Sequence, residues 1–567
     1  MPEYDLVIRG GTIVDGTRLP AYKADLAIRD GKIAKISGRL AGSAKRELDA
    51  AGCNVAPGAI DLHCHYDAQV NWDPYCSLSG WHGVTSLTIG QCGFGFAPTH
   101  PDDREANMEM MCRIEAIPMA SMRAGMRWDW VTFPEYLDSL DRQGLGLNIG
   151  SLFPYSPARA YVMGIDDSRR RARMTDAEST QIKQLFYEAM QAGAFGFSAD
   201  KSLEDRPADG SYLPTHVAAD QEFFDLAEIL REFGVGHIGW TRGIPDRMGA
   251  NKDRDFLIRL AELSGRPLQW GLVHTVPDRP EIHQEQLAWL EAMHRRGLPM
   301  YAQSMAVEVS QRFTMEDYNG FDTMPRWLEA TLGSVEERAA RLGDPAVRAG
   351  LKTDLEAAGR DSLEAWSRYK VLEVTQERNH QYEGRTITDI AQREGKEPMD
   401  AFLDLALDEE LQCLFAAMRQ HVPDGEILAH PHTHFSLSDG GAHTRYHTAS
   451  TWPTHFLGYW VRERNLMSIE DAHYKMSALP AWIAGFRDRG LLREGMAADV
   501  IVYDLGAIGF EQGDPVFETD FPGKERRLIQ KATGYRYTIV NGVVTFEGAR
   551  CTGALPGKLL RSYDMAR

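Results

Sequence analysis

The sequence predicts an α/β protein in which a (β/α)8 TIM-like barrel carries a small β-sandwich domain made from both chain ends. Two observations support this fold class. Short apolar runs alternate with helix-favouring segments through the middle of the chain, as they do in barrels of parallel strands. Both ends consist of alternating apolar runs separated by glycine-containing turns, and 567 residues suffice for more than one domain.

The two terminal segments read as parts of one β domain. Residues 1–57 contain YDLVIRGGTIVDG and ADLAIRDGKIAKIS, in which Gly-Gly and Asp-Gly pairs lie between alternating apolar runs. Residues 485–567 repeat this texture in AADVIVYDLG and YRYTIVNGVVTFEG, where Asn541 and Gly542 separate two strand-like runs. We therefore expect the chain to leave this domain after its first part and to re-enter it near the C-terminus.

Residues 58–484 are predicted to form the barrel. They contain eight apolar, strand-like runs, beginning with GAIDLHCH, and helix-favouring text such as TDAESTQIKQLFYEAMQA lies between many of them. The segment from about 310 to 425 is too long for one connection between strands. Its charged text, including SVEERAARLGDPAVRAGLKTDLEAAGRD, predicts a helical insertion beside the last strands.

Composition excludes some classes of partner. The formal net charge is −19, from 62 Lys and Arg against 81 Asp and Glu, and no basic run is present that could neutralise phosphates, so we expect no nucleic acid partner. The N-terminus lacks the features of a signal peptide, and no window approaches the ~18–20 apolar residues of a membrane span. Seven scattered cysteines, an odd number, favour a reduced, cytoplasmic protein. We expect its partner to be a small-molecule substrate.

The stretch PGAIDLHCHYD places two histidines one residue apart at the end of the first barrel strand. Alternate residues of a strand point the same way, so His63 and His65 share a face, roughly 6–7 Å apart along the strand. Two imidazoles side by side at a strand end are a natural start for a metal site. Taken alone, two hydrogen-bonded surface histidines are the simpler interpretation.

Further metal-ligand types end other predicted strands. Cys92 lies in GQCGFGFAP after the second strand, His274 in LVHT after the sixth, and Asp439 in LSDGGAH after the last. Catalytic groups of such barrels gather at the C-terminal ends of the strands. Histidine, cysteine and aspartate are zinc ligands, although another divalent metal remains possible.

This combination resembles the amidohydrolase superfamily, and within it the D-aminoacylase (N-acyl-D-amino-acid deacylase) family. The resemblance covers nearly the whole chain and includes PGAIDLHCHYD, GQCGFGFAP, AGAFGFS, SDGGAH, GLLREGMAADVIVYD and TGALPGKLLR. It implies a site of one or two zinc ions and, by analogy of fold, a homo-oligomer. The residues that match the family's metal positions are His63, His65, Cys92, His274 and Asp439.

One departure from the family pattern concerns the fifth strand. The family has a histidine two residues before an arginine, whereas GWTRG puts Trp240 before Arg242. His237 is the alternative ligand, but it lies about 10 Å below that slot in a regular strand. A β-bulge at Gly236 or Gly239 would be needed to raise it. We therefore predict that the second metal is weakly held or absent.

Two residues are candidates for substrate binding. His443 matches the family's SDG-x-x-H run, and a hydrogen bond within its own loop is the alternative role. Arg159, in LFPYSPARAYV, is a candidate anchor for a substrate carboxylate, although a surface-loop arginine is the simpler interpretation. Cys64 faces away from the two histidines and is expected to pack against a helix, and His82 is expected to tether a loop.

The predicted activity is hydrolysis of an amide C–N bond by metal-activated water, with Asp439 as the general base and acid. An N-acyl-amino-acid deacylase is the first hypothesis. Opening of a cyclic amide, imide or lactone on the same site is the second. A metal-free binding or scaffold protein, as some members of the superfamily have become, is the third.

Overall fold

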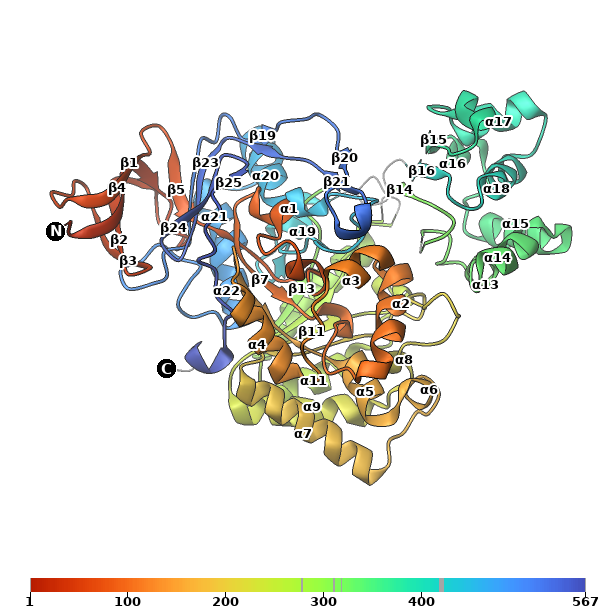
Figure 1. The fold of residues 1–567 in the computed structure, drawn as a ribbon, viewed down its shortest axis with the longest axis horizontal. Coiled ribbons are helices and arrows are strands. Elements are labelled where there is room, and N and C mark those ends of the chain that lie inside the picture. The colour runs from red at the N-terminus through yellow and green to blue at the C-terminus, as the bar shows by residue number, and fades with distance from the viewer. Residues whose placement is uncertain (1, 277–278, 309–311, 318, 418–422, 566–567) are drawn as a thin grey trace.

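The two ends of the chain meet in one sheet. The computed structural model describes residues 2–276, 279–308, 312–317, 319–417 and 423–565. A nine-stranded sheet has the order β25-β24-β23-β18-β5-β1-β2-β3, with β4 pairing with β1 (Figure 1). Its strands are β1 (Tyr4–Ile13), β2 (Tyr22–Arg29), β3 (Lys32–Ser37), β4 (Ala44–Asp49), β5 (Asn54–Pro57), β18 (Val500–Tyr503), β23 (Tyr535–Val540), β24 (Val543–Glu547) and β25 (Arg550–Cys551).

Antiparallel pairing of β5 with β18 joins the first part of this sheet to the last. The predicted turn between β23 and β24 is present, and both of its residues, Asn541 and Gly542, have positive φ angles, of 45° and 80°. Asparagine and glycine tolerate this backbone conformation best.

Parallel strands form the centre of the molecule. A three-stranded sheet contains β6 (Ala59–Asp61), β7 (Val84–Ile89) and β8 (Asn148–Ser151). A six-stranded sheet contains β9 (Phe153–Pro154), β10 (Gly196–Asp200), β11 (His237–Thr241), β12 (Leu268–Gly271), β13 (Met300–Gln303) and β17 (Thr433–His434). Their pairings are parallel, so all carboxyl ends face the same side.

Backbone hydrogen bonds link these two sheets at both ends. The Leu152 N–H donates to the Ile89 carbonyl at 2.9 Å, and the Leu62 N–H donates to the Ser436 carbonyl at 3.0 Å. The segment after the last parallel strand, β17, therefore lies directly beside the end of the first, β6.

Amphipathic helices cover the outer faces of the parallel strands. They include α4 (Phe133–Gln143), α7 (Asp176–Ala192), α9 (Asp220–Phe233), α11 (Arg254–Ser264) and α12 (Glu281–Arg295). Capping boxes start α4 at Thr132 and α7 at Thr175, where the hydroxyl accepts from the third-residue N–H and the glutamate there reaches back. Within the described ranges, none of the helices has the length and apolarity that a bilayer crossing requires.

Residues 312–417 form a lobe that projects from the body, drawn in green to teal at the upper right of Figure 1. Its helices are α13 (Pro325–Ala330), α14 (Val335–Gly343), α15 (Pro345–Ala357), α16 (Leu363–Trp366), α17 (Ile387–Glu394) and α18 (Pro398–Asp408). The lobe has its own core around Phe321, Trp327 and Phe402. It also contains a three-stranded antiparallel sheet of β14 (Arg312–Phe313), β15 (Tyr369–Glu373) and β16 (Leu414–Ala417), which the helical prediction did not include.

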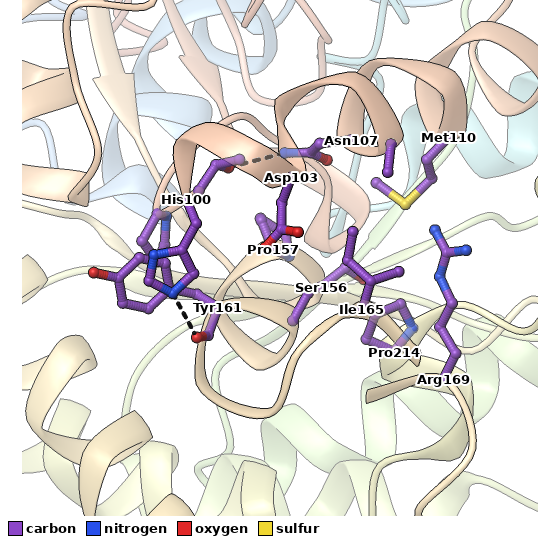
Figure 2. Close-up of a pocket in the computed structure, with 14 residues that line it drawn as sticks. His100, Asp103, Asn107, Met110, Ser156, Pro157, Tyr161, Ile165, Arg169 and Pro214 are labelled. Atoms are coloured by element: carbon purple, nitrogen blue, oxygen red, sulfur yellow. Dashed lines mark hydrogen bonds between the residues drawn. The ribbon is translucent and has the colours of Figure 1, made fainter. Parts of the chain in front are cut away.

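A small cavity lies between α2 (Arg104–Ile114) and α5 (Tyr155–Met163) and is shown in Figure 2. Its volume is about 30 Å³. The His100 ring stacks on Tyr161 with centroids 3.9 Å apart, and its Nε2 lies 3.1 Å from the Tyr161 carbonyl. The cavity contains none of the predicted metal ligands.

Candidate metal centre

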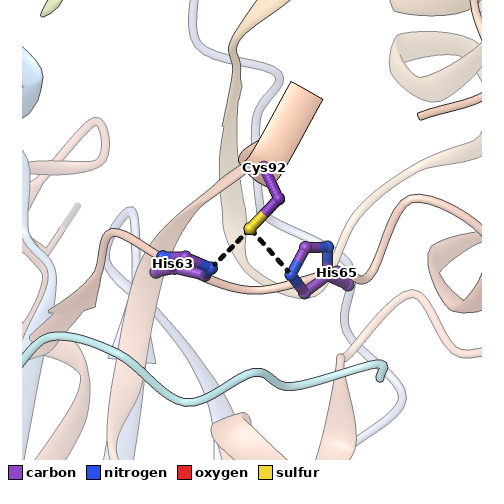
Figure 3. Close-up of side chains that lie close together, drawn as sticks. All are labelled: His63, His65 and Cys92. Atoms are coloured by element: carbon purple, nitrogen blue, oxygen red, sulfur yellow. Dashed lines mark hydrogen bonds between the residues drawn. The ribbon is translucent and has the colours of Figure 1, made fainter. Parts of the chain in front are cut away.

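Three predicted ligands from two neighbouring strand ends converge in the structure. His63 and His65 follow β6, and Cys92 follows β7. The Cys92 Sγ lies 3.2 Å from the His63 Nε2 and 3.9 Å from the His65 Nε2. Figure 3 shows the three side chains pointing toward one another.

Asp439 completes this group from the segment after β17. Its Oδ1 lies 3.5 Å from the His63 Nε2 and 3.9 Å from the His65 Nε2. The loop is held against the histidine strand because the Asp439 N–H donates to the His63 carbonyl at 3.2 Å, and the His65 N–H donates to the Gly440 carbonyl at 2.6 Å. A side chain at Gly441 would place its Cβ 2.4 Å from the His65 carbonyl oxygen, so this close approach requires glycine.

Three site residues have a backbone conformation that non-glycine residues seldom adopt. Cys92, Asp439 and His443 have φ angles of 55°, 48° and 48°. Such conformations cost free energy, and they persist where the surrounding structure enforces them. Here the enforced turns point the functional side chains into one pocket.

Burial determines the protonation of the donors. It lowers the pKa of His65 to about 3, with a further contribution from His63, so the imidazole is neutral and keeps a lone pair. Burial, together with Asp200 and Glu115, raises the pKa of the Cys92 thiol. Burial alone would raise the pKa of Asp439, but the neighbouring imidazoles, foremost His63, outweigh it and lower that pKa.

The donor set fits a zinc ion. Zinc bonds of about 2.0–2.3 Å in a tetrahedron separate the donor atoms by about 3.3–3.7 Å. The Cys92 Sγ and the Asp439 Oδ1 each lie 3.2 to 3.9 Å from the two histidine Nε2 atoms, close to this, and the His63, His65 and Cys92 donors all lie within 4.8 Å of one another. The Gln303 Oε1 lies 3.0 Å from the His63 Nδ1 and accepts a hydrogen bond from its N–H, which leaves the lone pair of Nε2 available to a metal.

The four donors line a cavity of about 170 Å³ that is also lined by acidic side chains. Its other charged residues are Glu115, Asp200, Asp205 and Arg247. The Asp200 Oδ2 is buried without a hydrogen-bond partner. The sequence analysis identified none of these four as site residues, although Asp200 ends strand β10, a position where such barrels gather catalytic groups. The other three follow no motif.

The structure places His443 in the cavity wall but does not place His274 there. His443 lines the cavity, and its Nε2 lies 3.5 Å from the Glu115 Oε2. Its contact with a substrate stays a prediction. His274 lies three residues beyond β12, is half-buried, and is not among the side chains that line the cavity. Its role as a ligand stays a prediction.

His237, the alternative ligand, is not raised to the metal site, in agreement with the regular strand that the sequence analysis favoured. It is the first residue of β11, and the pairing of β10 with β11 runs from Gly196–His237 to Asp200–Thr241 without a register shift. No bulge therefore brings it up. Thr241 stands at the end of β11, about 13 Å further along a regular strand. Trp240 packs outward, with its ring 5.1 Å from that of Phe223 on α9.

The structure corrects the role of substrate anchor that was considered for Arg159. Its side chain is fully buried and forms a bidentate pair with Glu222, with Nε at 2.9 Å and Nη2 at 3.1 Å from the two carboxylate oxygens. Nη1 and Nη2 also donate to the carbonyls of Ser168 and Arg171. With its donors occupied away from the cavity, Arg159 cannot anchor a substrate carboxylate there.

The predicted tether at His82 is confirmed, and Cys64 faces away from the metal donors as expected. The Cys64 thiol is buried and donates to the Thr88 carbonyl at 3.2 Å, away from the metal donors. His82 tethers distant segments through contacts of 2.7 Å from Nδ1 to the Thr454 Oγ1 and 2.8 Å from Nε2 to the Gln530 carbonyl.

Comparison with known proteins places this site in a family. The model of the Amidohydrolase family matches residues 46–546, which is most of the chain. The chain belongs to the amidohydrolase family. An N-acyl-D-aspartate deacylase from Alcaligenes xylosoxydans xylosoxydans is 27% identical over 577 residues, with 99% of this chain and 95% of that protein covered. This confirms the resemblance that the motifs indicated.

Solved structures of family members share the fold. A D-aminoacylase structure, from work on its binuclear metal centre, matches with a TM-score of 0.67 and 23% identity, over 98% of this chain and 100% of that one. The N-acyl-D-glutamate deacylase of Bordetella bronchiseptica, in complex with zinc and a phosphonate inhibitor, matches with a TM-score of 0.66 and 23% identity, over 98% and 99% of the two chains. The amidohydrolase thus has the α/β fold of the D-aminoacylases.

Proposed function

We propose that this amidohydrolase is a zinc-dependent deacylase that cleaves the amide C–N bond of N-acyl amino acids. The observation that carries the proposal is the convergence of the His63, His65 and Cys92 donors beside Asp439 in one cavity. Relatives that match over nearly their full lengths are named deacylases of N-acyl-D-aspartate and N-acyl-D-glutamate. Their names support the substrate class.

We infer one tightly held zinc ion. His63, His65, Cys92 and Asp439 would hold it, and zinc in such a set supplies Lewis acidity that activates water and polarises a carbonyl. The fifth strand presents Thr241 to the cavity in place of an imidazole, so a second ion has fewer donors. The D-aminoacylase structure is described as showing activation by one metal and attenuation by the second, which is compatible with catalysis by one ion.

Asp439 is the proposed general base and acid. The imidazoles around it lower its pKa, so the carboxylate is ionised at neutral pH and can accept a proton from the attacking water. The same oxygen then delivers the proton to the leaving nitrogen. His443, which lines the cavity beside Glu115, is placed to contact the bound substrate.

We also propose that the nine parallel strands, with β8 and β9 counted as one position interrupted at Leu152, close into a (β/α)8 barrel. Residues 1–57 and 485–567 would form the sandwich domain. The hydrogen bonds from the Leu62 and Leu152 N–H groups, which link the two parallel sheets, support closure. Metal donors at the carboxyl ends of the strands are where a barrel places its active site.

The cellular setting is proposed from the chain's side chains. Its seven cysteines are free thiols, which suits a reducing cytoplasm.

Trp482, which is 69% exposed, lies on α22 (Leu479–Ala484) at the edge of a surface pocket of about 410 Å³. A large exposed aromatic beside a pocket suits contact with a second copy of the chain. Light scattering of the wild type and of Trp482→Arg tests the homo-oligomer.

The experiment that tests the function combines metal analysis with a substrate panel. The zinc-loaded protein is assayed by mass spectrometry against N-acyl-D-amino acids, N-acyl-L-amino acids and cyclic amides. We expect hydrolysis of an N-acyl amino acid, with loss of activity on chelation and recovery on zinc addition. Hydrolysis of cyclic amides alone would favour the ring-opening alternative, and protein without bound zinc or activity would favour a scaffold.

Asp439→Asn gives the sharper mechanistic test. It keeps the shape of the side chain and removes the base, so we expect kcat to fall by roughly 10²–10⁴-fold on the substrate that the panel identifies. Asp471→Asn is the matched control, because Asp471 pairs with Arg18 at the surface and changes charge equally. A wild-type kcat in Asp439→Asn would refute the assignment of the base.

A further inference from the structure

We propose that Glu115 is an additional ligand of the cation held by His63, His65, Cys92 and Asp439. Glu115 follows α2, and it is one of the four cavity residues that the sequence analysis did not identify. The inference rests on the metal site of the proposed function and adds a donor to it.

The Glu115 carboxylate lies beside one of the proposed metal donors. Its Oε1 lies 3.6 Å from the His65 Nε2. That nitrogen also lies 3.9 Å from the Cys92 Sγ and 3.9 Å from the Asp439 Oδ1. The Glu115 oxygen is therefore as close to the metal-facing nitrogen as the predicted ligands are.

The negative charge around the Glu115 carboxylate favours binding of a cation. Its side chain is 5% exposed, and the described residues provide no arginine or lysine within 4.0 Å of its carboxylate. Its charged neighbours include Asp439, Asp205 and Asp200. A buried carboxylate among acids is stabilised only by protonation or by a bound cation.

The carboxylate is held in place before any ion arrives. Two residues earlier, Arg113 Nη2 donates to the Asp322 Oδ2 of the projecting lobe at 3.0 Å, and its Nη1 donates to the Arg206 carbonyl at 3.0 Å. The Glu115 carbonyl accepts the His443 N–H at 2.6 Å. The backbone that carries the carboxylate is thus fixed from two sides.

A simple hydrogen bond from His65 to Glu115 does not fit the metal site as well. It would require a proton on the His65 Nε2, and that proton would occupy the lone pair that faces Cys92 and Asp439. The nitrogen that binds the ion cannot also donate. If the His65 Nε2 and the Glu115 carboxylate both bind one ion, the position of both groups is explained. A hydrogen bond between them does not explain both.

The test measures metal binding and not activity. The full chain is stripped with a chelator and titrated with Zn²⁺ and with Co²⁺, whose visible bands report the number and type of ligands. We expect Glu115→Gln to weaken Zn²⁺ binding more than about 100-fold and to alter the Co²⁺ bands. Asp205→Asn, a change at another acid of the same cavity, is the matched control and should keep the wild-type bands.

The outcomes separate the alternatives. Wild-type Co²⁺ bands in Glu115→Gln overturn the proposal whether or not the affinity falls, because a lost ligand must change them and a lost charge need not. Glu115→Asp serves if the glutamine variant does not fold, as judged by circular dichroism, and it too should alter the bands. If the wild-type protein binds neither ion, the proposed function itself is refuted. This outcome is distinct from failure of the Glu115 proposal alone.

Discussion

The Thr241 hydroxyl donates to the Cys92 sulfur at 3.2 Å, so the end of strand β11 contacts the proposed metal site through an oxygen. This contact lowers the pKa of Cys92, although burial, the largest influence, raises it. The thiolate is the form that binds a metal, and a hydrogen bond to the sulfur stabilises it.

Thr241→Val is therefore expected to weaken zinc binding. A lost hydrogen bond of about 1 kcal/mol corresponds to roughly fivefold in apparent affinity at neutral pH. A competition titration with a zinc indicator measures this, and Thr241→Ser, which keeps the hydroxyl, is the control. Equal affinities in the valine and serine variants would show that the hydroxyl does not assist Cys92.

His237→Ala is expected to leave the number of bound zinc ions unchanged. His237 is fully buried at the start of β11, far from the cavity, so its removal leaves a void and lowers the free energy of unfolding by about 2 kcal/mol. Elemental analysis and urea unfolding measure the two quantities. Two tightly bound ions in the wild type and one in the variant would make His237 a ligand after all.

Arg159→Met is expected to destabilise the protein without changing KM. Removing one partner of a buried ion pair costs about 3–5 kcal/mol, because Glu222 keeps an uncompensated charge. Urea unfolding checks the loss, and Arg159→Met combined with Glu222→Leu should recover part of it. A selective rise in KM at unchanged stability would restore Arg159 as a substrate anchor.

His82 is expected to make stability depend on pH between about 4 and 6.5. Burial lowers its pKa to about 4 in the folded protein, against 6.5 in the unfolded chain. In this window the unfolded chain binds more protons, so stability falls as the pH falls through it, and no further change comes from His82 below or above it. Urea unfolding of the wild type and of His82→Gln should converge as the pH drops from 6.5 to 4. A difference independent of pH would contradict this.

Local motifs predicted most of the metal centre. His63 and His65 alternate along one strand, and Cys92 and Asp439 end two others, so a fold with parallel strands brings them together without further information. The absence of an imidazole at the end of strand β11 was also predictable from the sequence, because Trp240 occupies the position where the family has a histidine. Glu115 was not readable, since one glutamate at a helix end has no periodic or spacing signal.

The sequence by itself determined the alternation of strands and helices, the return of the chain to its first sheet, and the His, Cys and Asp donors, because these depend on local periodicity and on short motifs. Tertiary structure alone decided which remaining charges face the cavity. Asp200 reaches it from the end of strand β10, Arg247 from the end of α10 (Ile244–Arg247), and Glu115 and Asp205 from loops, whereas Arg159 is paired with Glu222 away from it. The physical reason is that a charged side chain in a loop is placed by its partners, and those partners are distant in sequence: Asp322 of the projecting lobe holds Arg113 from 209 positions away.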